Sequence, residues 1–589
     1  NINYNIAIGV ETFLGADLGS ASTDIVGNIA IGAYALDATA ANAQTGTIAI
    51  GHSALTALTS GAGNTAVGYQ ALMTEDSGVK NTAIGYQALA NVDADDGKNT
   101  AVGHTAGTAM TGGYLNTIVG AEAADELLTG ISNTVVGARA FNAADGSESR
   151  NIAIGTDCMS AVDNNLSVGN VAIGNDALTG GTGAVIGNIA IGRNALNGTT
   201  NQAQTGTIAI GQDALTTLTS GNYNIAIGYQ SQDALTIGDY NVSLGYAALG
   251  TNVDGSYNTA VGHQSLEVFE ANAENEGFNT ALGYNSGRFT TTGEYNTFIG
   301  SQAGQGITGT RLTGDSNTAV GKDAGLLLQG AAATNTMVGY GAGSACTTAE
   351  HNVAIGSGAG VGVTGDKNVA IGKGAMGDAD ADATVGASAN NVFIGYNAGG
   401  GTWETAASSQ NVAIGYQALD AALNGAQNNV CVGLNAMTAA TEADNNVGIG
   451  TGDLELLIDG TLNVGVGYDS EASATDGTNQ IMIGASITGI GDNYAVIGNS
   501  SITRVYGSQD AGATFYGAGQ SWSDKRVKED VKDIGLGLDF INKLEPIQYT
   551  KRQPVDYEDS LKSKLNVVEE GQKERALRVI SEEEKSRLR

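Results

Sequence analysis

Residues 81–89 read NTAIGYQAL, and this nonapeptide decides the fold because the chain returns to it many times. Close copies are NTAVGYQAL at 64–72, NTAVGHQSL at 258–266 and NVAIGYQAL at 411–419. The consensus is Asn-x-Ala-(Ile/Val)-Gly-x-x-(Ala/Ser)-(Leu/Gly). About 28 copies lie between Asn5 and Gly498, most of them roughly 17–19 residues apart. This period predicts an all-β solenoid of the β-helix or β-roll type, with one turn, or rung, for each repeat.

A longer repeat lies above the nonapeptide. NIAIG at 28–32 and AQTGTIAIG at 43–51 recur at 188–192 and 203–211, with a constant offset of 160 residues. Duplication of a block of rungs is easily tolerated by a solenoid, because each rung contacts only its neighbours.

Each conserved position of the repeat has a physical interpretation. Alternation along a strand places Thr82 and Ile84 on one face and Ala83 on the other. We expect the β-branched face to pack against the opposing strand of the same rung, and the alanine face to meet a close neighbour such as another subunit. Gly85 permits a corner with positive φ or a close backbone approach. Asn81 is expected to stack with its counterparts in a hydrogen-bonded ladder.

The composition agrees with stacked β-structure and excludes one function class. The 589 residues include 88 glycines and 2 prolines, with 5% aromatic and 15% charged residues. The net charge of −34 excludes phosphate-based nucleic-acid binding, which needs a basic surface. We interpret the acidity as a source of solubility for a long extracellular protein. The alternatives are cation binding and repulsion from acidic surfaces.

We predict no disulfide, no metal site and no cofactor. Cys158, Cys346 and Cys431 lie far apart in the repeats as small apolar residues, and the four histidines come from separate rungs. The chain has no run of about 18 apolar residues, so we expect no membrane insertion. It begins at Asn1 without an initiator Met or a signal peptide, and we therefore expect a fragment or processed form that lacks an upstream attachment segment.

An aromatic or histidine residue often follows the glycine of the repeat. These residues offer either a platform for sugars or a stacked ladder that covers the corner of each rung, and we favour the ladder. They are Tyr69, Tyr86, His104, Tyr229, Tyr246, His263, Tyr284, Tyr340, Tyr396, Tyr416 and Tyr468.

The composition changes near residue 500. We divide the chain into a solenoid shaft at 1–498, an end cap and tip loop at 499–522, and a separate segment at 523–589. That last segment holds both prolines and 15 of the 26 basic residues, with 15 acidic ones. Val531, Ile534, Leu538 and Ile541 have helical spacing, residues 547–549 alternate as a short strand, and residues 560–589 read as helix. The segment is thus predicted to be α-rich.

The segment begins with Ser523-Asp524-Lys525-Arg526-Val527-Lys528 and continues with a Leu-Glu-Pro-Ile-Gln-Tyr stretch at 544–549. This pattern resembles the C-terminal intramolecular chaperone domain of phage tail spikes and endosialidases. The shaft, over about 500 residues, is similar to phage tail-fibre shafts and to the head repeats of trimeric bacterial adhesins.

The chaperone resemblance implies a trimer, assistance to the folding of a β-helical shaft, and self-cleavage. It makes Ser523 the nucleophile, Lys528 the base and Trp522–Ser523 the cut bond. A lysine with a depressed pKa can take the proton of a serine hydroxyl, which is otherwise a poor nucleophile. The family's further Gly-, Ile- and Ala-rich segment is absent after Tyr549, so a tail that is retained uncut stays an alternative.

The expected function is that of a structural fibre of a phage virion. We expect a homotrimer that contacts other tail or baseplate proteins and reaches a glycan or protein receptor on a bacterial surface. One alternative is a polysaccharide-degrading tail spike, with acids in the spacers such as Asp93, Asp95 and Asp96, or Asp378, Asp380 and Asp382. The other is a bacterial trimeric adhesin, which would need a membrane anchor that the charged tail does not offer.

Overall fold

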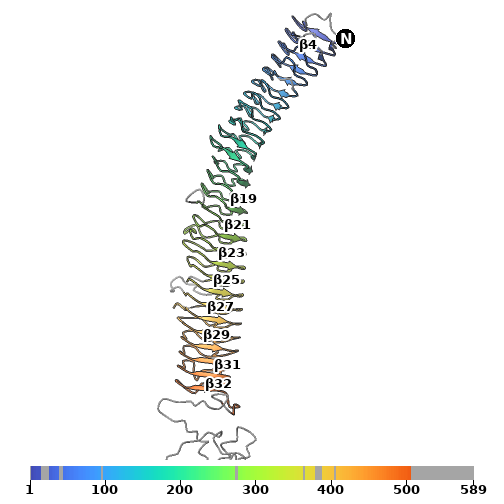
Figure 1. Cartoon of the computed structure of the whole chain (residues 1–589). Helices are drawn as coiled ribbons and strands as arrows, with labels where there is room; N and C mark the ends of the chain where they lie inside the picture. The colour runs from blue at the N-terminus through green and yellow to red at the C-terminus, as the bar shows by residue number, and fades with distance from the viewer. Residues whose placement is uncertain are drawn as a thin grey trace, which may run out of the picture. The chain divides into compact units, whose positions relative to one another are not determined.

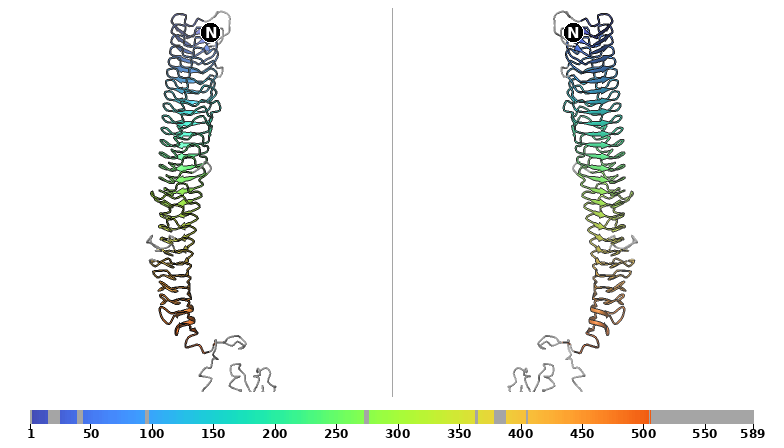
Figure 2. Two further views of the ribbon diagram at one scale, coloured as in Figure 1. Left: turned by 90° about the vertical axis from the view of Figure 1, so that its left-hand side faces the viewer. Right: turned by 90° about the vertical axis from the view of Figure 1, so that its right-hand side faces the viewer.

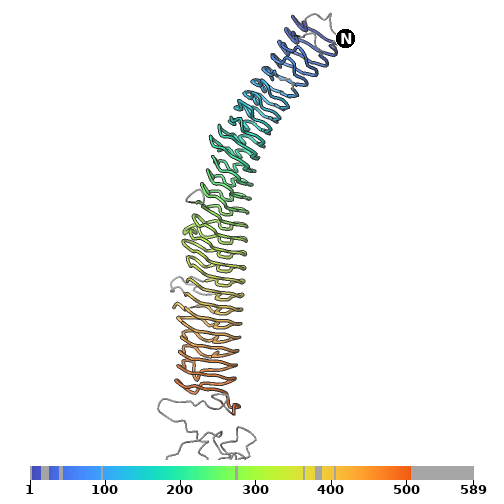
Figure 3. Tube along the Cα trace, in the orientation of Figure 1, coloured from blue at the N-terminus to red at the C-terminus, as the bar shows by residue number. Residues whose placement is uncertain are grey.

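The computed structural model describes residues 2–14, 25–38, 44–93, 97–271, 276–362, 365–377, 388–403, 406–503 and 505. Within these ranges the chain is an all-β parallel solenoid of about 26 turns without a helix. Figure 1 shows the strands stacked in the order of the sequence, and the tube of Figure 3 shows one rung following another. The predicted all-β repeat solenoid is therefore confirmed. The chain divides into two compact units, Asn1–Thr503 and Arg504–Arg589, and the described strands all belong to the first.

One open ladder carries the stack, and each strand in it pairs in parallel with the strands of the turns before and after (Figure 2). In chain order its strands are β2 (Ile6–Ile8), β4 (Ile29–Ile31), β6 (Ile48–Ile50), β7 (Thr65–Val67), β8 (Thr82–Ile84), β9 (Thr100–Val102), β10 (Thr117–Val119), β11 (Thr134–Val136), β12 (Ile152–Ile154), β13 (Val171–Ile173), β15 (Ile189–Ile191), β17 (Ile208–Ile210), β18 (Ile225–Ile227), β19 (Val242–Leu244), β20 (Thr259–Val261), β21 (Thr280–Leu282), β22 (Thr297–Ile299), β23 (Thr318–Val320), β24 (Thr336–Val338), β25 (Val353–Ile355), β26 (Val369–Ile371), β27 (Val392–Ile394), β28 (Val412–Ile414), β29 (Val430–Val432), β30 (Val447–Ile449), β31 (Val464–Glu471), β32 (Ile481–Thr488) and β33 (Ala495–Ile497). Two short side ladders join β1 (Ile2–Asn3), β3 (Ile25–Val26) and β5 (Gln44–Thr45), and β14 (Val185–Ile186) with β16 (Gln204–Thr205).

The asparagine of the repeat forms the predicted ladder. The register aligns equivalent residues, as in the pairing of Ala83 with Ala101, so an asparagine lies against the asparagine of the next rung at most positions. Thr47, Thr207 and Gln480 take the place of the asparagine in three rungs. The amide N–H of Asn81 donates to Oδ1 of Asn64 at 2.8 Å, and that of Asn99 donates to Oδ1 of Asn81 at 2.9 Å. These side chains are buried, so each bond satisfies polar groups that water does not reach.

The glycine of the repeat is required by the contact between rungs. Gly85 has a φ of 147°, and a Cβ atom on it would lie 2.0 Å from the carbonyl oxygen of Gly103. Gly103 meets Gly120 in the same way, at 2.1 Å. Both the positive φ and the close backbone approach that the sequence predicts at this position are confirmed, and no L-residue with a side chain fits there.

The two faces of the strand lie opposite to our expectation. In β8 the alanine, Ala83, is fully buried inside the solenoid, whereas Ile84 is 40% exposed and Thr82 is half-buried. The prediction that the β-branched face packs within the rung and that the alanine face meets another subunit was therefore wrong. The interior is narrow, because Leu89, which follows β8 within the same rung, is also buried in it, and only a small residue fits opposite that leucine at most rungs.

The interior keeps its volume by exchanging large and small residues between neighbouring positions. Where a phenylalanine replaces the strand alanine, as at Phe298, the leucine positions around it are glycines. A Cβ atom on Gly287 or Gly304 would lie 2.7 or 2.3 Å from the Phe298 ring. Phe393 and Gly399 repeat the arrangement, with 2.5 Å. This compensation is the rule for a close-packed core.

The three cysteines are buried in this interior as small apolar residues, as predicted, and none is in a disulfide. Burial raises the pKa of Cys158 and of Cys346 to about 12, so both thiols stay protonated. In the described ranges we find no helix with the length and apolar character needed to cross a membrane.

Candidate interaction surface

The outward face of the ladder carries aliphatic and threonine side chains and no charged residue. From β2 to β30, the first residue of each three-residue strand is Ile, Val or Thr and the third is Ile, Val or Leu. Several third residues are more than a third exposed, including Leu244 and Leu282, each at 46%. An uncharged surface of this length is unusual on a protein with 60 acidic residues, because soluble monomers seldom expose large apolar patches.

Stacked aromatic columns border this face. In the rungs of β6 to β9, the residues that follow the glycine stack with ring centroids 5.1–5.4 Å apart, from His52 through Tyr69 and Tyr86 to His104. Tyr229, Tyr246, His263 and Tyr284 form a second such column, and Tyr396 stacks on Tyr416. The predicted stacked ladder is confirmed for these residues. Tyr340 instead lies 5.3 Å from the Lys322 ammonium, which is a cation–π distance.

A further aromatic column was not predicted from the sequence. It consists of the residues that precede the asparagine of the repeat, and its rings are about half exposed and stacked at 4.8–5.4 Å. The signal was present in the sequence as a recurring aromatic-Asn pair. Its members are Tyr223, Tyr240, Tyr257, Phe278 and Tyr295.

The geometry of the columns disfavours a sugar platform. Sugars pack on the open face of an aromatic ring, whereas neighbouring rings such as Tyr69 and Tyr86 are inclined by only 9° and cover each other. A ligand that approaches from the side meets ring edges. The columns therefore reinforce the stacking of the rungs.

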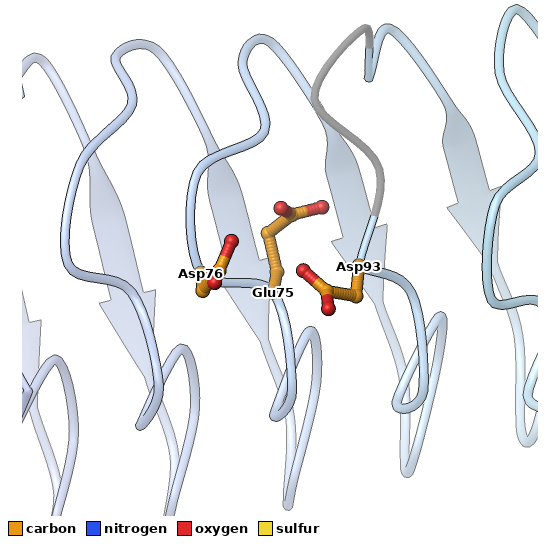
Figure 4. Close-up of side chains that lie close together, drawn as sticks. All are labelled: Glu75, Asp76 and Asp93. Atoms are coloured by element: carbon orange, nitrogen blue, oxygen red, sulfur yellow. The ribbon is translucent and has the colours of Figure 1, made fainter.

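Two groups of three carboxylates lie at one corner of the solenoid, and the first is structural. Figure 4 shows Glu75 and Asp76 on one turn with Asp93 on the next, and one carboxylate oxygen of each lies within 4.8 Å of the others. Glu75 is fully buried. Its Oε1 accepts from the N–H of Gly78 at 2.6 Å, and its Oε2 accepts from Nδ2 of Asn81 at 3.2 Å. Glu75 thus stabilises the backbone of its own rung and accepts a hydrogen bond from the asparagine ladder.

Two further carboxylates, one fully buried and one partly buried, occupy positions where most copies of the repeat have apolar residues. Asp453 stands in place of the alanine of the turn, and burial raises its pKa to about 6. Gly465 makes room for it, since a Cβ atom there would lie 2.6 Å from Oδ2 of Asp453. Burial likewise raises the pKa of Glu471 to about 7, although it accepts from the N–H groups of Glu455 and Leu456. The sequence signal was the change from Ala to Gly in VGIG and VGVG, which we did not interpret.

The predicted cleavage residues Trp522, Ser523 and Lys528 lie outside the described residues, as do the helices and the strand predicted at 523–589. Of the spacer acids named for the enzyme alternative, Asp93 lies in the group with Glu75 and Asp76. The other five fall outside the described ranges. Within the described residues, a cavity of about 10 Å³ beside Met337 and Cys346 has room for a water but not for a sugar.

No family model matches this chain, and no curated protein matches its sequence.

Proposed function

We propose that the chain is the shaft of a phage tail fibre, which assembles as a homotrimer and carries a contact region to a bacterial surface. The observation that supports this most directly is the uncharged Ile/Val/Thr face, which continues along the ladder from β2 to β30. A repetitive stack with one continuous adhesive face suits a structural role better than catalysis. The resemblance of residues 523–549 to trimeric phage chaperones supports the choice of three chains.

The energetics favour association through this face. Covering the exposed part of one or two aliphatic side chains and of the threonine methyl groups in each rung contributes on the order of 0.5–1 kcal/mol per turn. Over about 26 turns the sum is on the order of 10–25 kcal/mol, which offsets the roughly 4–15 kcal/mol that association costs. Repulsion between the acidic chains is screened over about 8 Å in physiological salt.

Two measurements test the proposal: the oligomeric state of the wild type, and the oligomeric state of a variant with charges placed in the Ile/Val/Thr face. We expect the purified chain to have three times the mass of one chain, by light scattering. Replacing Leu244 and Leu282 with lysine together should give monomers or aggregates, because each lysine places a charge within the contact. The matched control replaces Leu166 and Leu456, which are exposed on turns, and should remain trimeric. A monomeric wild type, or a trimeric face variant, would contradict the proposal.

We also propose that residues 523–589 act as an intramolecular chaperone and are released by self-cleavage before Ser523. After folding and denaturation, the wild type should lose the 67 residues from Ser523 to Arg589, as measured by intact mass. A Ser523→Ala chain should keep them, because the nucleophile is gone. Ser521→Ala is the control and should be cut as the wild type is. If all three chains keep the full mass, the tail is a permanent part of the fibre and Ser523 has no catalytic role.

A further inference from the structure

The second group of three carboxylates, Asp145, Glu148 and Asp163, differs from the first in its chemistry. Asp145 and Glu148 come from the turn after β11, and Asp163 comes from the turn after β12. One carboxylate oxygen of each lies within 4.8 Å of the others. Asp145 and Asp163 occupy equivalent positions in consecutive rungs, so the stacking of the solenoid holds their negative charges together.

Glu148 supplies the second observation. It is fully buried, and its Oε2 accepts from the N–H of Gly146 at 3.1 Å. Its Oε1 is also buried and has no hydrogen-bond partner within the described part of the chain. A buried carboxylate oxygen without a partner is costly, and a cation supplies the missing interaction. Glu75 at the equivalent corner has no such need, because both of its oxygens accept hydrogen bonds.

The electrostatics of the group point the same way. Burial raises the pKa of Glu148 despite nearby backbone amides, and the charges of Asp145 and Asp163 raise it further. Burial also raises the pKa of Asp163, as do its side-chain hydrogen bond with Asp145 and the charges of Asp145 and Glu126. The neighbouring charges that act on these two groups are therefore all negative.

The surrounding turn is held in place by hydrogen bonds of its own. Oδ1 of Asn165 accepts from the N–H of Ser147 at 2.7 Å, which ties the turn after β11 to the turn after β12. Gly146 is required for this clamp, because a Cβ atom on it would lie 1.6 Å from Oδ1 of Asn165. Asp145 and Glu148 flank this clamp, so the backbone that carries both residues is held in place, and the hydrogen bond from Gly146 also fixes the Glu148 carboxylate.

From this geometry we propose that Asp145, Glu148 and Asp163 form a binding site for a divalent cation, and that the cation is Ca²⁺. Three carboxylates are hard oxygen ligands, which both Ca²⁺ and Mg²⁺ prefer. Calcium accepts irregular sets of six to eight oxygens, whereas magnesium demands a regular octahedron with shorter distances. Ligands that come from two stacked rungs, partly exposed, suit the more permissive ion.

The number of calcium ions bound per chain tests the site. The full chain, stripped of metal, is titrated with CaCl2 by calorimetry at neutral pH in 150 mM NaCl, beside Asp163→Asn and Glu148→Gln. We expect each variant to bind one fewer ion per chain than the wild type. Asp476→Asn removes the same charge from an exposed turn and should bind the wild-type number. MgCl2 should bind at this site at least tenfold more weakly.

Several outcomes would overturn the proposal. The same number of ions in all four chains would mean that the site is empty. Non-saturating binding by the wild type would mean that the acidic chain only attracts counterions. Magnesium that binds as tightly as calcium would overturn the assignment to calcium. Circular dichroism of each variant shows whether it is folded. Because Asp163 is partly exposed, its substitution leaves the core intact.

Discussion

A Gly103→Ala chain is expected to lose the stacking of β9 on β10 and at least about 3 kcal/mol of local stability. The new Cβ would lie 2.1 Å from the Gly120 carbonyl oxygen, and a φ of 148° is itself strained for alanine. The rungs must separate to relieve the contact. Hydrogen exchange should then show lost protection where the Gly120 N–H donates to the Val102 carbonyl at 2.9 Å.

The matched control is Gly112→Ala in the same turn. A Cβ atom there would approach only Cγ2 of Thr129, at an ordinary 3.6 Å, and Gly112 does not have a positive φ. We expect exchange and stability close to those of the wild type. Equal effects at Gly103 and Gly112 would mean that chain flexibility, and not the contact between rungs, explains the repeated glycine.

Removing one member of the asparagine ladder is expected to cost about 2–4 kcal/mol locally. In an Asn116→Ala chain the N–H of Asn133 loses its acceptor, Oδ1 of Asn116, at 2.9 Å. The carbonyl of Gly130 loses its donor, Nδ2 of Asn116, at 2.8 Å. Both groups stay buried, and each unsatisfied group costs roughly 1–3 kcal/mol.

The measurement is urea unfolding followed by hydrogen exchange in peptides that cover residues 117–136. A solenoid unfolds in segments, so one global midpoint does not describe it. Glu126→Ala is the control because its side chain is exposed after β10 and lies outside the Ile/Val/Thr face, and it should have little effect. Wild-type protection in the Asn116→Ala chain would show that water replaces the lost bonds and that the ladder contributes little to stability.

The asparagine and glycine positions were predictable from the sequence because strict repetition and a parallel register leave them few roles. The inward face was not predictable. Alternation shows that Thr82 and Ile84 share a face, but alanine and isoleucine are both apolar, and hydrophobicity alone favours burying the larger one. Whether alanine or isoleucine faces inward depends on the width of the interior. Leu89 limits that width, and its backbone has a φ of 50°. Such a conformation is rare for leucine, and its side-chain pattern gives no sign of it.

The candidate sites divide in the same way. The aromatic column after the glycine was predictable, because its residues share one position in the repeat. The group of Asp145, Glu148 and Asp163 was not, because it depends on which spacer residues the register brings together. Spacer lengths vary from rung to rung, and only the three-dimensional arrangement shows that Asp145 stacks on Asp163.

The asparagine ladder also sets how the protein can change its reach during evolution. The 160-residue block that separates Asn28 from Asn188 contains nine strands of the main ladder, from β4 to β13. With rungs about 4.8 Å apart, its duplication lengthens the stack by roughly 43 Å. Each asparagine bonds only to its neighbours, so a whole number of rungs can be gained or lost in one recombination event. The length of the solenoid is therefore inherited and can change in steps of one rung.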